Sequence, residues 1–194
     1  MNNTNKLYLA SRSPRRVELL KQIGVDCTIL PADINESELP NEDAVSYVQR
    51  LAREKAQVVL QQLRRHDTAI LAADTTVVFN NHILGKPRDD NNAYHMLHML
   101  AGSSHWVHTA VTLAYDGRIE TLLSSTLVEM MPLTQAQITA YIHRGEHHDK
   151  AGSYGIQGTA GGWIKRIEGS YTGVMGLPLF ETAQLLRKNG ILTL

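Results

Sequence analysis

The spacing of hydrophobic residues near the start of the chain predicts a strand followed by a helix. Residues 6–10 form a short apolar run that is typical of a strand. Ser13 suits the N-cap of a helix, Pro14 its first position and Gly24 its C-terminal stop. Between them, apolar positions recur at helical spacing as Val17, Leu20 and Ile23. A strand that leads into a helix indicates α/β organisation.

A longer helical pattern covers roughly residues 42–63. Its apolar face is predicted to consist of Val45, Val48, Ala52, Val59 and Leu63. Arg50, Arg53 and Lys55 are expected to lie off this face. The helix is therefore expected to be amphipathic, with its apolar side against the rest of the protein.

Two strand-like segments contain residue pairs that favour tight turns. Residues 68–84 predict two strands joined at the Asn-Asn pair 80–81. The segment 105–130 is also β-rich, with a turn expected at the Asp-Gly pair 116–117. Asn, Asp and Gly tolerate the positive φ angles that such turns require.

Three further helices are predicted from their end signals. One covers about residues 89–100, with aspartates for its cap and Gly102 for its stop. A second covers about residues 134–144, behind a T-x-x-Q capping box. The last follows Pro178 and ends before Gly190.

The region from Gly145 to Gly176 contains nine of the fourteen glycines. Glycine lets the backbone approach a ligand, but it also marks turns and bulges in ordinary β structure. Residues 162–169 read as a strand, and Gln157 either pairs with the edge of a base or is solvated. No linker or repeat interrupts the chain, so one domain is expected.

The composition is that of a globular protein and argues against several functions. Hydrophobic residues make up 43% of the 194 residues, and nineteen basic residues balance nineteen acidic ones. A net charge of zero argues against a general affinity for nucleic acid or a membrane surface, so an anion site must be local. Cys27 is the only cysteine, which precludes an intrachain disulfide. Without a signal pattern or a membrane-spanning run, the chain is expected to be soluble and cytoplasmic.

The segment SRSPRR places Arg12, Arg15 and Arg16 at the start of the first predicted helix. The first N–H groups of a helix are unpaired and partly positive, so added cations cost stability unless an anion binds. Helix N–H groups, serine hydroxyls and arginines together suit phosphate oxygens. The alternative is an ordinary Ser-Pro helix start with solvated arginines.

A lone carboxylate, Asp74, closes the apolar run AILAAD. A buried charge needs partners, and α/β proteins tend to bind ligands at the carboxyl ends of strands. Asp74 is therefore a candidate general base or metal ligand, with Arg15 and Lys86 in similarly placed loops. The alternative is an aspartate that faces solvent or bonds to Thr75 or Thr76.

The histidines match known zinc patterns poorly. The segment His143–His147 reads HRGEH and fits H-x-x-E-H, a pattern that requires one continuous helix. Gly145 falls at the predicted helix end, so a zinc protease site is not expected. His105 and His108 occupy odd and even strand positions and are expected on opposite faces.

Five motifs occur in a recognisable order: LASRSPRRVELLKQIG, LAREKA, AADTTVVFNNHILGKPRD, DKAGSYGIQG and GSYTGVMGLPL. Over about residues 7–186 the chain resembles the Maf family of nucleotide pyrophosphatases. The resemblance implies one Maf-like domain over residues 1–194, with a Maf/ITPase-like fold. That fold is α/β (mixed α+β), a twisted mixed β-sheet flanked by helices with a central cleft. It also implies a homodimer.

Within that family, the chain looks most similar to the branch that acts on dTTP and UTP. SPRR without an inserted aromatic residue, Thr75 after the aspartate and YGIQG support this branch over one resembling a 7-methyl-GTP pyrophosphatase. The implied reaction is hydrolysis of a nucleoside triphosphate between the α and β phosphates. House-cleaning of modified nucleotides is a further possibility, and a nucleotide-binding regulator of septum formation is the alternative.

The resemblance also implies roles for particular residues. Asp74 would be the proton acceptor. Positions associated with substrate choice match Arg15, Thr75 and Gln157. Other polar positions of the cleft match Ser11, Glu36, Lys55 and Lys86. A divalent cation, Mg²⁺ or Mn²⁺, is implied, with Glu36 and Asp74 as its expected ligands.

Overall fold

The computed structural model describes residues 6–63 and 68–193, so the ends of the expected 1–194 domain lie outside the described part. The strands are β1 (Leu7–Leu9), β2 (Thr28–Ile29), β3 (Ala69–Phe79), β4 (His82–Leu84), β5 (Ser104–Tyr115), β6 (Arg118–Met130) and β7 (Ile164–Glu168). The α-helices are α1 (Pro14–Gln22), α2 (Ala44–Leu63), α3 (Asp90–Leu100), α4 (Gln135–His143), α5 (Tyr171–Val174) and α6 (Leu179–Lys188). Two short 3-10 helices, η1 (Ala151–Ser153) and η2 (Thr159–Trp163), lie between α4 and β7.

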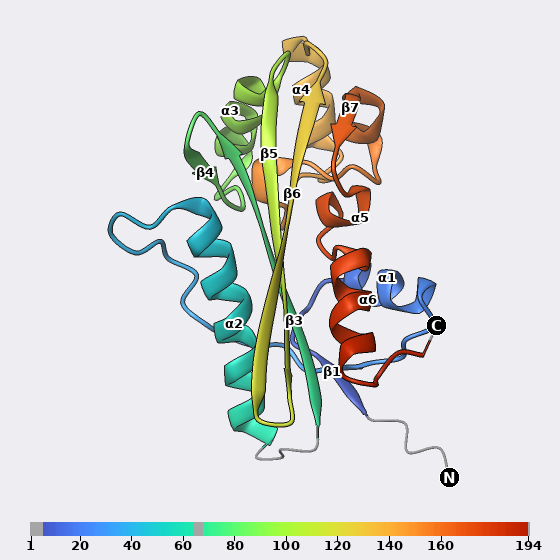
Figure 1. Ribbon diagram of the computed structural model, residues 1–194. Coiled ribbons are helices and arrows are strands. Elements are labelled where there is room, and N and C mark those ends of the chain that lie inside the picture. Colours follow the sequence, from blue (N-terminus) through green and yellow to red (C-terminus); the bar gives the residue numbers. More distant parts are fainter. Residues whose placement is uncertain (1–5, 64–67, 194) are drawn as a thin grey trace.

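The strands form one mixed, twisted sheet in the order β2-β1-β3-β5-β6-β7, with β4 also paired to β3 (Figure 1). β1 is parallel to both β2 and β3, and all other pairs are antiparallel. The expected mixed α/β fold, with a twisted sheet flanked by helices, is confirmed. The sequence analysis missed β2, whose two residues are both exposed, and α5, which is only four residues long.

The predicted turns and one predicted capping box are confirmed. Asn80 and Asn81 have φ angles of 49° and 63° at the β3–β4 turn. The expected Asp-Gly turn joins β5 to β6, also with positive φ at both residues. At the start of α4, Gln137 N donates to Thr134 Oγ1 at 3.3 Å, and Thr134 N donates to Gln137 Oε1 at 2.8 Å.

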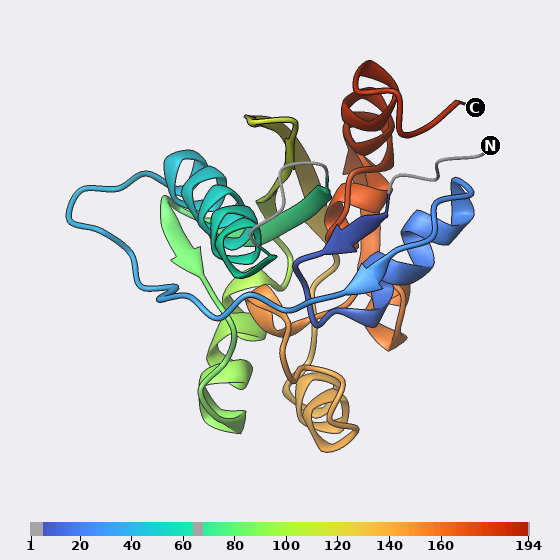
Figure 2. The same cartoon turned by 90° about the horizontal axis from the view of Figure 1, so that it is seen from below.

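Helices cover both faces of the sheet. Figure 2 shows α2 on one side of the sheet, with α1 and α6 on the other. Because side chains alternate along β3, Ile70 and Ala72 pack with Ala56 and Val59 of α2. Leu71 and its odd-numbered neighbours pack in the core that includes residues of α1 and α6. A further core joins α3, α4 and the 3-10 helices at the far end of β5 and β6.

One edge of β3 has a gap between two strand neighbours. β1 pairs with residues 69–71 of β3, and β4 pairs with residues 77–79, while β5 occupies the opposite edge along residues 70–78. Residues 72–76 therefore have no neighbouring strand on the first edge. A ligand that enters this gap can reach side chains from both faces of the sheet.

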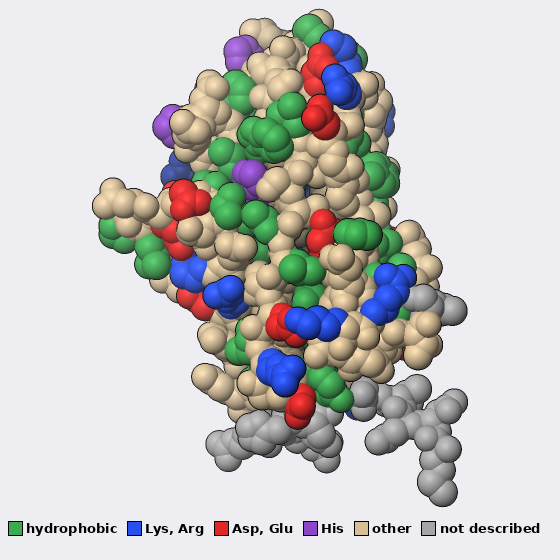
Figure 3. Space-filling model, in the orientation of Figure 1, with side chains coloured by type: hydrophobic (Ala, Val, Ile, Leu, Met, Phe, Trp, Pro, Cys, Tyr) green, Lys and Arg blue, Asp and Glu red, His purple; other side chains and the backbone are tan. Residues whose placement is uncertain are grey.

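On the face of the molecule that Figure 3 shows, acidic and basic side chains are interspersed. Over residues 6–63 and 68–193, none of the helices combines the length and apolar character that crossing a membrane requires.

Candidate functional site

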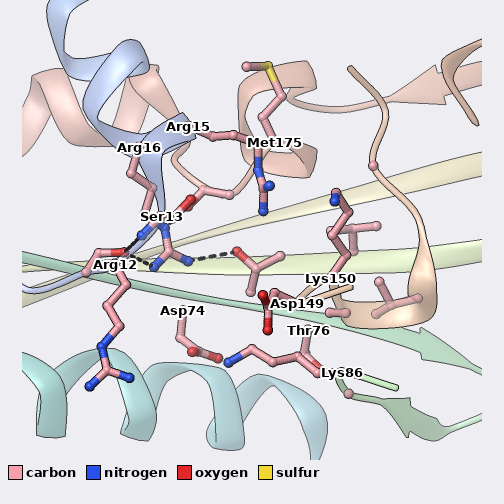
Figure 4. A pocket seen from close by; sticks show the side chains of 18 of the residues that line it. Arg12, Ser13, Arg15, Arg16, Asp74, Thr76, Lys86, Asp149, Lys150 and Met175 are labelled. Carbon is pink, nitrogen blue, oxygen red and sulfur yellow. Dashed lines mark hydrogen bonds between the residues drawn. The ribbon is translucent and has the colours of Figure 1, made fainter. Parts of the chain in front are cut away.

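A cavity of about 920 Å³ opens at the gap in the edge of β3 (Figure 4). Its walls come from the loop after β1, the loop before α2, the middle of β3, the loop after β4 and the segment around η1. All eight residues expected at the site line this cavity: Ser11, Arg15, Glu36, Lys55, Asp74, Thr75, Lys86 and Gln157. Segments far apart in the sequence thus converge on one space.

Asp74 lies in the middle of β3, so its expected place at the carboxyl end of a strand is wrong. The apolar run continues through Val77 and Val78, and these residues extend the strand beyond the aspartate. The strand that does end here is β1, whose Leu9 pairs with Leu71. The cavity therefore adjoins the carboxyl end of β1, and Asp74 faces it from the neighbouring strand.

Lys55 is buried on the inner face of α2, so its expected position off the apolar face is also wrong. It is 8% exposed and follows Val48 and Ala52 at helical spacing. Its Nζ lies 2.6 Å from Asp74 Oδ1 and 2.7 Å from Glu36 Oε1. A charged side chain can occupy the buried stripe here because two carboxylates offset the cost of desolvation.

Glu36 joins this pair to the cavity rim. Its Oε2 lies 3.3 Å from Lys86 Nζ, so the charges alternate from Asp74 through Lys55 and Glu36 to Lys86. The long loop before α2 carries Glu36, and Tyr47 of α2 donates from its hydroxyl to the Glu36 carbonyl at 2.8 Å. The loop is thereby tied to the helix that carries Lys55.

The two carboxyl groups have opposite pKa shifts. Burial raises the pKa of Asp74, and the charges of Lys55 and Arg16 only partly oppose this effect. Desolvation also acts to raise the pKa of Glu36, but the hydrogen bonds and charges of Lys55 and Lys86 outweigh it and lower that pKa. Asp74 is therefore the stronger base of the two, whereas Glu36 stays ionised to lower pH.

Arg16 holds the SRSPRR segment against the rest of the site, a role that the sequence analysis did not assign. Its Nε donates to Gly176 O at 2.7 Å, and its other guanidinium nitrogens contact Ser11 Oγ at 3.0 Å and Thr75 Oγ1 at 3.4 Å. The sequence contained a signal for this inward position: Arg16 lies three and four residues before Leu19 and Leu20, the buried residues of α1, and therefore shares their face of the helix.

The serine at the start of α1 does not cap the helix in the expected way. Ser13 occupies the N-cap position, but its side chain makes no capping hydrogen bond. Its backbone N–H instead donates to Ser11 Oγ at 3.1 Å. Ser11 thus orders the loop through both Ser13 and Arg16.

Arg15 extends into the cavity toward the side that carries Lys150 (Figure 4). Desolvation, followed by the charge of Arg15, lowers the pKa of Lys150. Two like charges facing one cavity favour an anion between them. The sequence analysis quoted Lys150 within DKAGSYGIQG but did not single it out.

Polar side chains complete the lining. Gln157 is exposed at the cavity, in the segment between η1 and η2. Thr75 Oγ1 is already engaged, since Thr109 Oγ1 lies 3.0 Å away in addition to the Arg16 contact. On the Asp74 face of β3, the buried hydroxyl of Thr76 has no hydrogen-bond partner among the described residues. That hydroxyl leaves one polar atom at the cavity for a ligand to satisfy.

The histidines are arranged as the sequence analysis expected. Helix α4 ends at His143 and Gly145 has a φ angle of 72°, so the HRGEH segment is not one helix. His105 is buried against Tyr154, whereas His108 contacts Ser125, which agrees with opposite faces of β5. Among the described residues, Asp90, His147 and His148 group their potential metal-ligating atoms within 4.8 Å of one another.

Comparison with known proteins gives close relatives of nearly full length. The family described as "Maf-like protein" matches residues 6–189. The "dTTP/UTP pyrophosphatase" of Methylobacillus flagellatus is 54% identical over 97% of this chain and 95% of its own length. The protein of that name from Nitrosomonas europaea is 48% identical over 96% of each chain. That of Bordetella parapertussis is 51% identical over 96% of this chain and 93% of its own.

Among solved structures, the Staphylococcus aureus Ham1 protein aligns over 64% of this chain and 71% of its own. The TM-score is 0.47 and the sequence identity 13%, a similarity that carries no argument about fold or function. The family match and the relatives at about 50% identity establish the family without that structure. With its motifs gathered around one cavity, the chain belongs to the Maf-like protein family.

Proposed function

We propose that this protein hydrolyses nucleoside triphosphates, dTTP and UTP above all, between the α and β phosphates, releasing the monophosphate and pyrophosphate. The observation that carries the proposal is the buried Asp74–Lys55 pair, which lines a cavity bordered by further cationic side chains. The relatives named dTTP/UTP pyrophosphatase, at about 50% identity over nearly their full length, support the choice of substrate.

The cations of the cavity suit the triphosphate. Arg15 and Lys150 line one part of the cavity, and Lys86 lies at its rim beside Glu36. Side chains placed in advance at the sites of developing negative charge stabilise the transition state of phosphoryl transfer. The unpaired N–H groups at the start of α1 add to the same field.

Asp74 is proposed to accept the proton of the water that attacks the α phosphorus. Burial raises its pKa, which brings the carboxylate closer to the strength needed of a base near neutral pH. Lys55 holds Oδ1 at 2.6 Å and so orients the group. General base catalysis of this kind contributes typically about 10²–10⁴-fold.

A divalent cation, Mg²⁺ or Mn²⁺, fits the residues at the cavity. Mg²⁺ takes oxygen ligands, commonly one or two carboxylates together with substrate phosphates and waters. Glu36 and Asp74 supply two such carboxylates, and the unpartnered hydroxyl of Thr76 lies beside them in the cavity lining. When bound, the ion would neutralise charge on the phosphates.

The base of the substrate is proposed to contact Gln157. Its exposed amide offers a donor and an acceptor for the edge of a pyrimidine. Thr75 contacts Arg16 and Thr109. We therefore propose that Thr75 influences substrate choice indirectly, by holding Arg16 in position. A base that leaves a buried polar group unpaired would bind less well by about 1–3 kcal/mol.

The decisive experiment is a screen of pyrophosphate release from dTTP, UTP, CTP and modified analogues, with Mg²⁺ or Mn²⁺. We expect dTTP and UTP to be the best substrates and the Asp74→Asn variant to be inactive but folded. Release of orthophosphate instead of pyrophosphate would show that cleavage does not occur between the α and β phosphates, and would contradict the proposed reaction. Equal cellular effects of wild type and Asp74→Asn would favour the regulator of septum formation instead.

We further propose a homodimer located in the cytoplasm, as the family resemblance and the single cysteine suggest. Light scattering on the purified protein tests the first proposal, and cell fractionation tests the second. A monomer at micromolar concentration would contradict the dimer.

A further inference from the structure

Two histidines and an aspartate outside the proposed catalytic group come together beside α3. His147 Nε2 lies 3.0 Å from Asp90 Oδ1, and the rings of His147 and His148 are 4.0 Å apart between centroids. Potential ligand atoms of all three residues lie within 4.8 Å of one another. We propose that Asp90, His147 and His148 bind a divalent transition-metal ion of the Zn²⁺ class.

The chain path explains why these residues meet. Asp90 is the first residue of α3, whereas the histidines follow α4. Gly145 has a φ angle of 72° and ends the helical path, and His148 N then donates to Gly145 O at 3.4 Å. The turn carries both histidines to Asp90 and leaves His143 behind on α4. A bound ion would therefore cross-link α3 to the segment after α4.

The surroundings of His147 suit a metal ligand. The residue is 1% exposed, and its Nε2 faces Asp90, while its Nδ1 has no hydrogen-bond partner among the described residues. Because Nε2 and the Asp90 carboxylate already face each other, an ion that binds between them would replace the proton of this hydrogen bond and release it to solvent. His148 and Asp90 are exposed, which leaves the site open to solvent and to an arriving ion.

The ligand chemistry separates this site from the carboxylates of the cavity. Two imidazoles and one carboxylate suit Zn²⁺ and related ions, whereas Glu36 and Asp74 offer only oxygen and suit Mg²⁺ or Mn²⁺. Tetrahedral Zn²⁺ with bonds of about 2.0–2.1 Å sets its ligand atoms roughly 3.3 Å apart. The 3.0 Å pair already approaches this spacing, and the 4.8 Å limit requires only a small side-chain movement.

The proposed metal site adjoins the nucleotide cavity. His148 lines that cavity, and Lys150 Nζ donates to the His148 carbonyl at 3.4 Å. An ion held by His148 would therefore restrict the segment that carries Lys150. Metal binding itself does not depend on the proposed pyrophosphatase activity, so failure of one proposal leaves the other to be judged separately.

Equilibrium dialysis of the full-length protein against Zn²⁺, with millimolar Mg²⁺ present to occupy oxygen-ligand sites, tests the proposal. We expect one Zn²⁺ per chain. The His148→Ala and Asp90→Asn variants replace exposed side chains and should stay folded, and each should bind Zn²⁺ at least about tenfold more weakly. His143→Ala is the matched control, because it removes an exposed histidine of the same sequence motif without touching the cluster.

A second control concerns His95 and His98, which are exposed and three residues apart on α3. The His98→Ala variant should bind Zn²⁺ as wild type does. Wild type with Co²⁺ bound should show the strong visible absorption of a tetrahedral site, and His148→Ala should lose it. The proposal is overturned if wild type binds no Zn²⁺, if His148→Ala and Asp90→Asn bind normally, or if His143→Ala or His98→Ala removes the binding.

Discussion

The ammonium group of Lys55 lies 2.6 Å from the carboxylate of Asp74, and both residues are 8% exposed. They come from different elements, α2 and β3, that pack against each other on one face of the sheet. The packing of α2 on the sheet therefore places the positive charge of Lys55 beside Asp74, the proposed base. Glu36, at 2.7 Å from the same ammonium, extends the arrangement to the cavity.

Replacing Lys55 with methionine should shift the pH dependence of activity. Lys55 lowers the pKa of Asp74, so its removal raises that pKa further and protonates the base at higher pH. The acid limb of kcat/KM should move upward by about 1–3 pH units, with a rate loss of roughly 100-fold at neutral pH. An acid limb that stays in place would show that Asp74 is not the titrating base.

Arg15 and Arg16 are adjacent in sequence but should respond differently to replacement by lysine. Arg16→Lys breaks contacts to Gly176, Ser11 and Thr75 and should lower the free energy of unfolding by about 1–3 kcal/mol. Arg15→Lys should leave stability near that of wild type and raise KM for the nucleotide. Urea denaturation and steady-state kinetics on both variants provide the comparison, and equal destabilisation by the two changes would contradict it.

Stability should fall in acid because His105 is held neutral. Burial lowers the pKa of His105 to about 4, and its Nε2 is hydrogen-bonded to the Tyr154 hydroxyl at 2.7 Å. Between about pH 6.5 and 4 the unfolded chain binds a proton there that the folded protein does not, so the folded state loses stability as pH falls. The slope from this group reaches at most about 1.4 kcal/mol per pH unit.

Denaturant titrations of wild type and His105→Gln at several pH values isolate this contribution. The difference in unfolding free energy between the two proteins should shrink as pH falls from 6.5 to 4, because only wild type loses the histidine contribution. A difference that is constant with pH would mean that His105 titrates normally in the folded protein.

Two glycines with similar backbone angles should tolerate alanine differently. Gly152 and Gly117 have φ angles of 67° and 72°, but a Cβ at Gly152 would lie 3.0 Å from the Val77 side chain, while that at Gly117 meets open space. Both variants carry the strain of positive φ, and only Gly152→Ala adds a steric conflict. Thermal unfolding should show Gly152→Ala less stable by roughly 1–3 kcal/mol than Gly117→Ala.

The double variant Gly152→Ala/Val77→Ala serves as the control for this comparison. Shortening Val77 removes the γ carbons that the new methyl group meets. The combined loss of stability should therefore be smaller than the sum of the two single losses. Simple additivity would assign the whole effect of Gly152→Ala to backbone strain.

Local chemistry determined much of the fold from the sequence alone. The turns at Asn80-Asn81 and Asp116-Gly117 and the end of α1 at Gly24 depend on residues that tolerate positive φ, a property of the residue itself. The capping box of α4 depends on two side chains three positions apart. Signals of this kind act within a few residues, so they can be read without knowing the rest of the structure.

The tertiary structure decided which charged residues are buried and where one edge of β3 has no neighbouring strand. Lys55 looked like a solvated lysine because its partners, Asp74 and Glu36, are nineteen residues away on either side of it in the chain. Arg16, rather than Arg15, holds the SRSPRR segment in place, because the fold brings the carbonyl of Gly176, 160 residues further along the chain, to accept its hydrogen bond. Burial of a charge depends on partners brought by long-range packing, and no local pattern of residues records them.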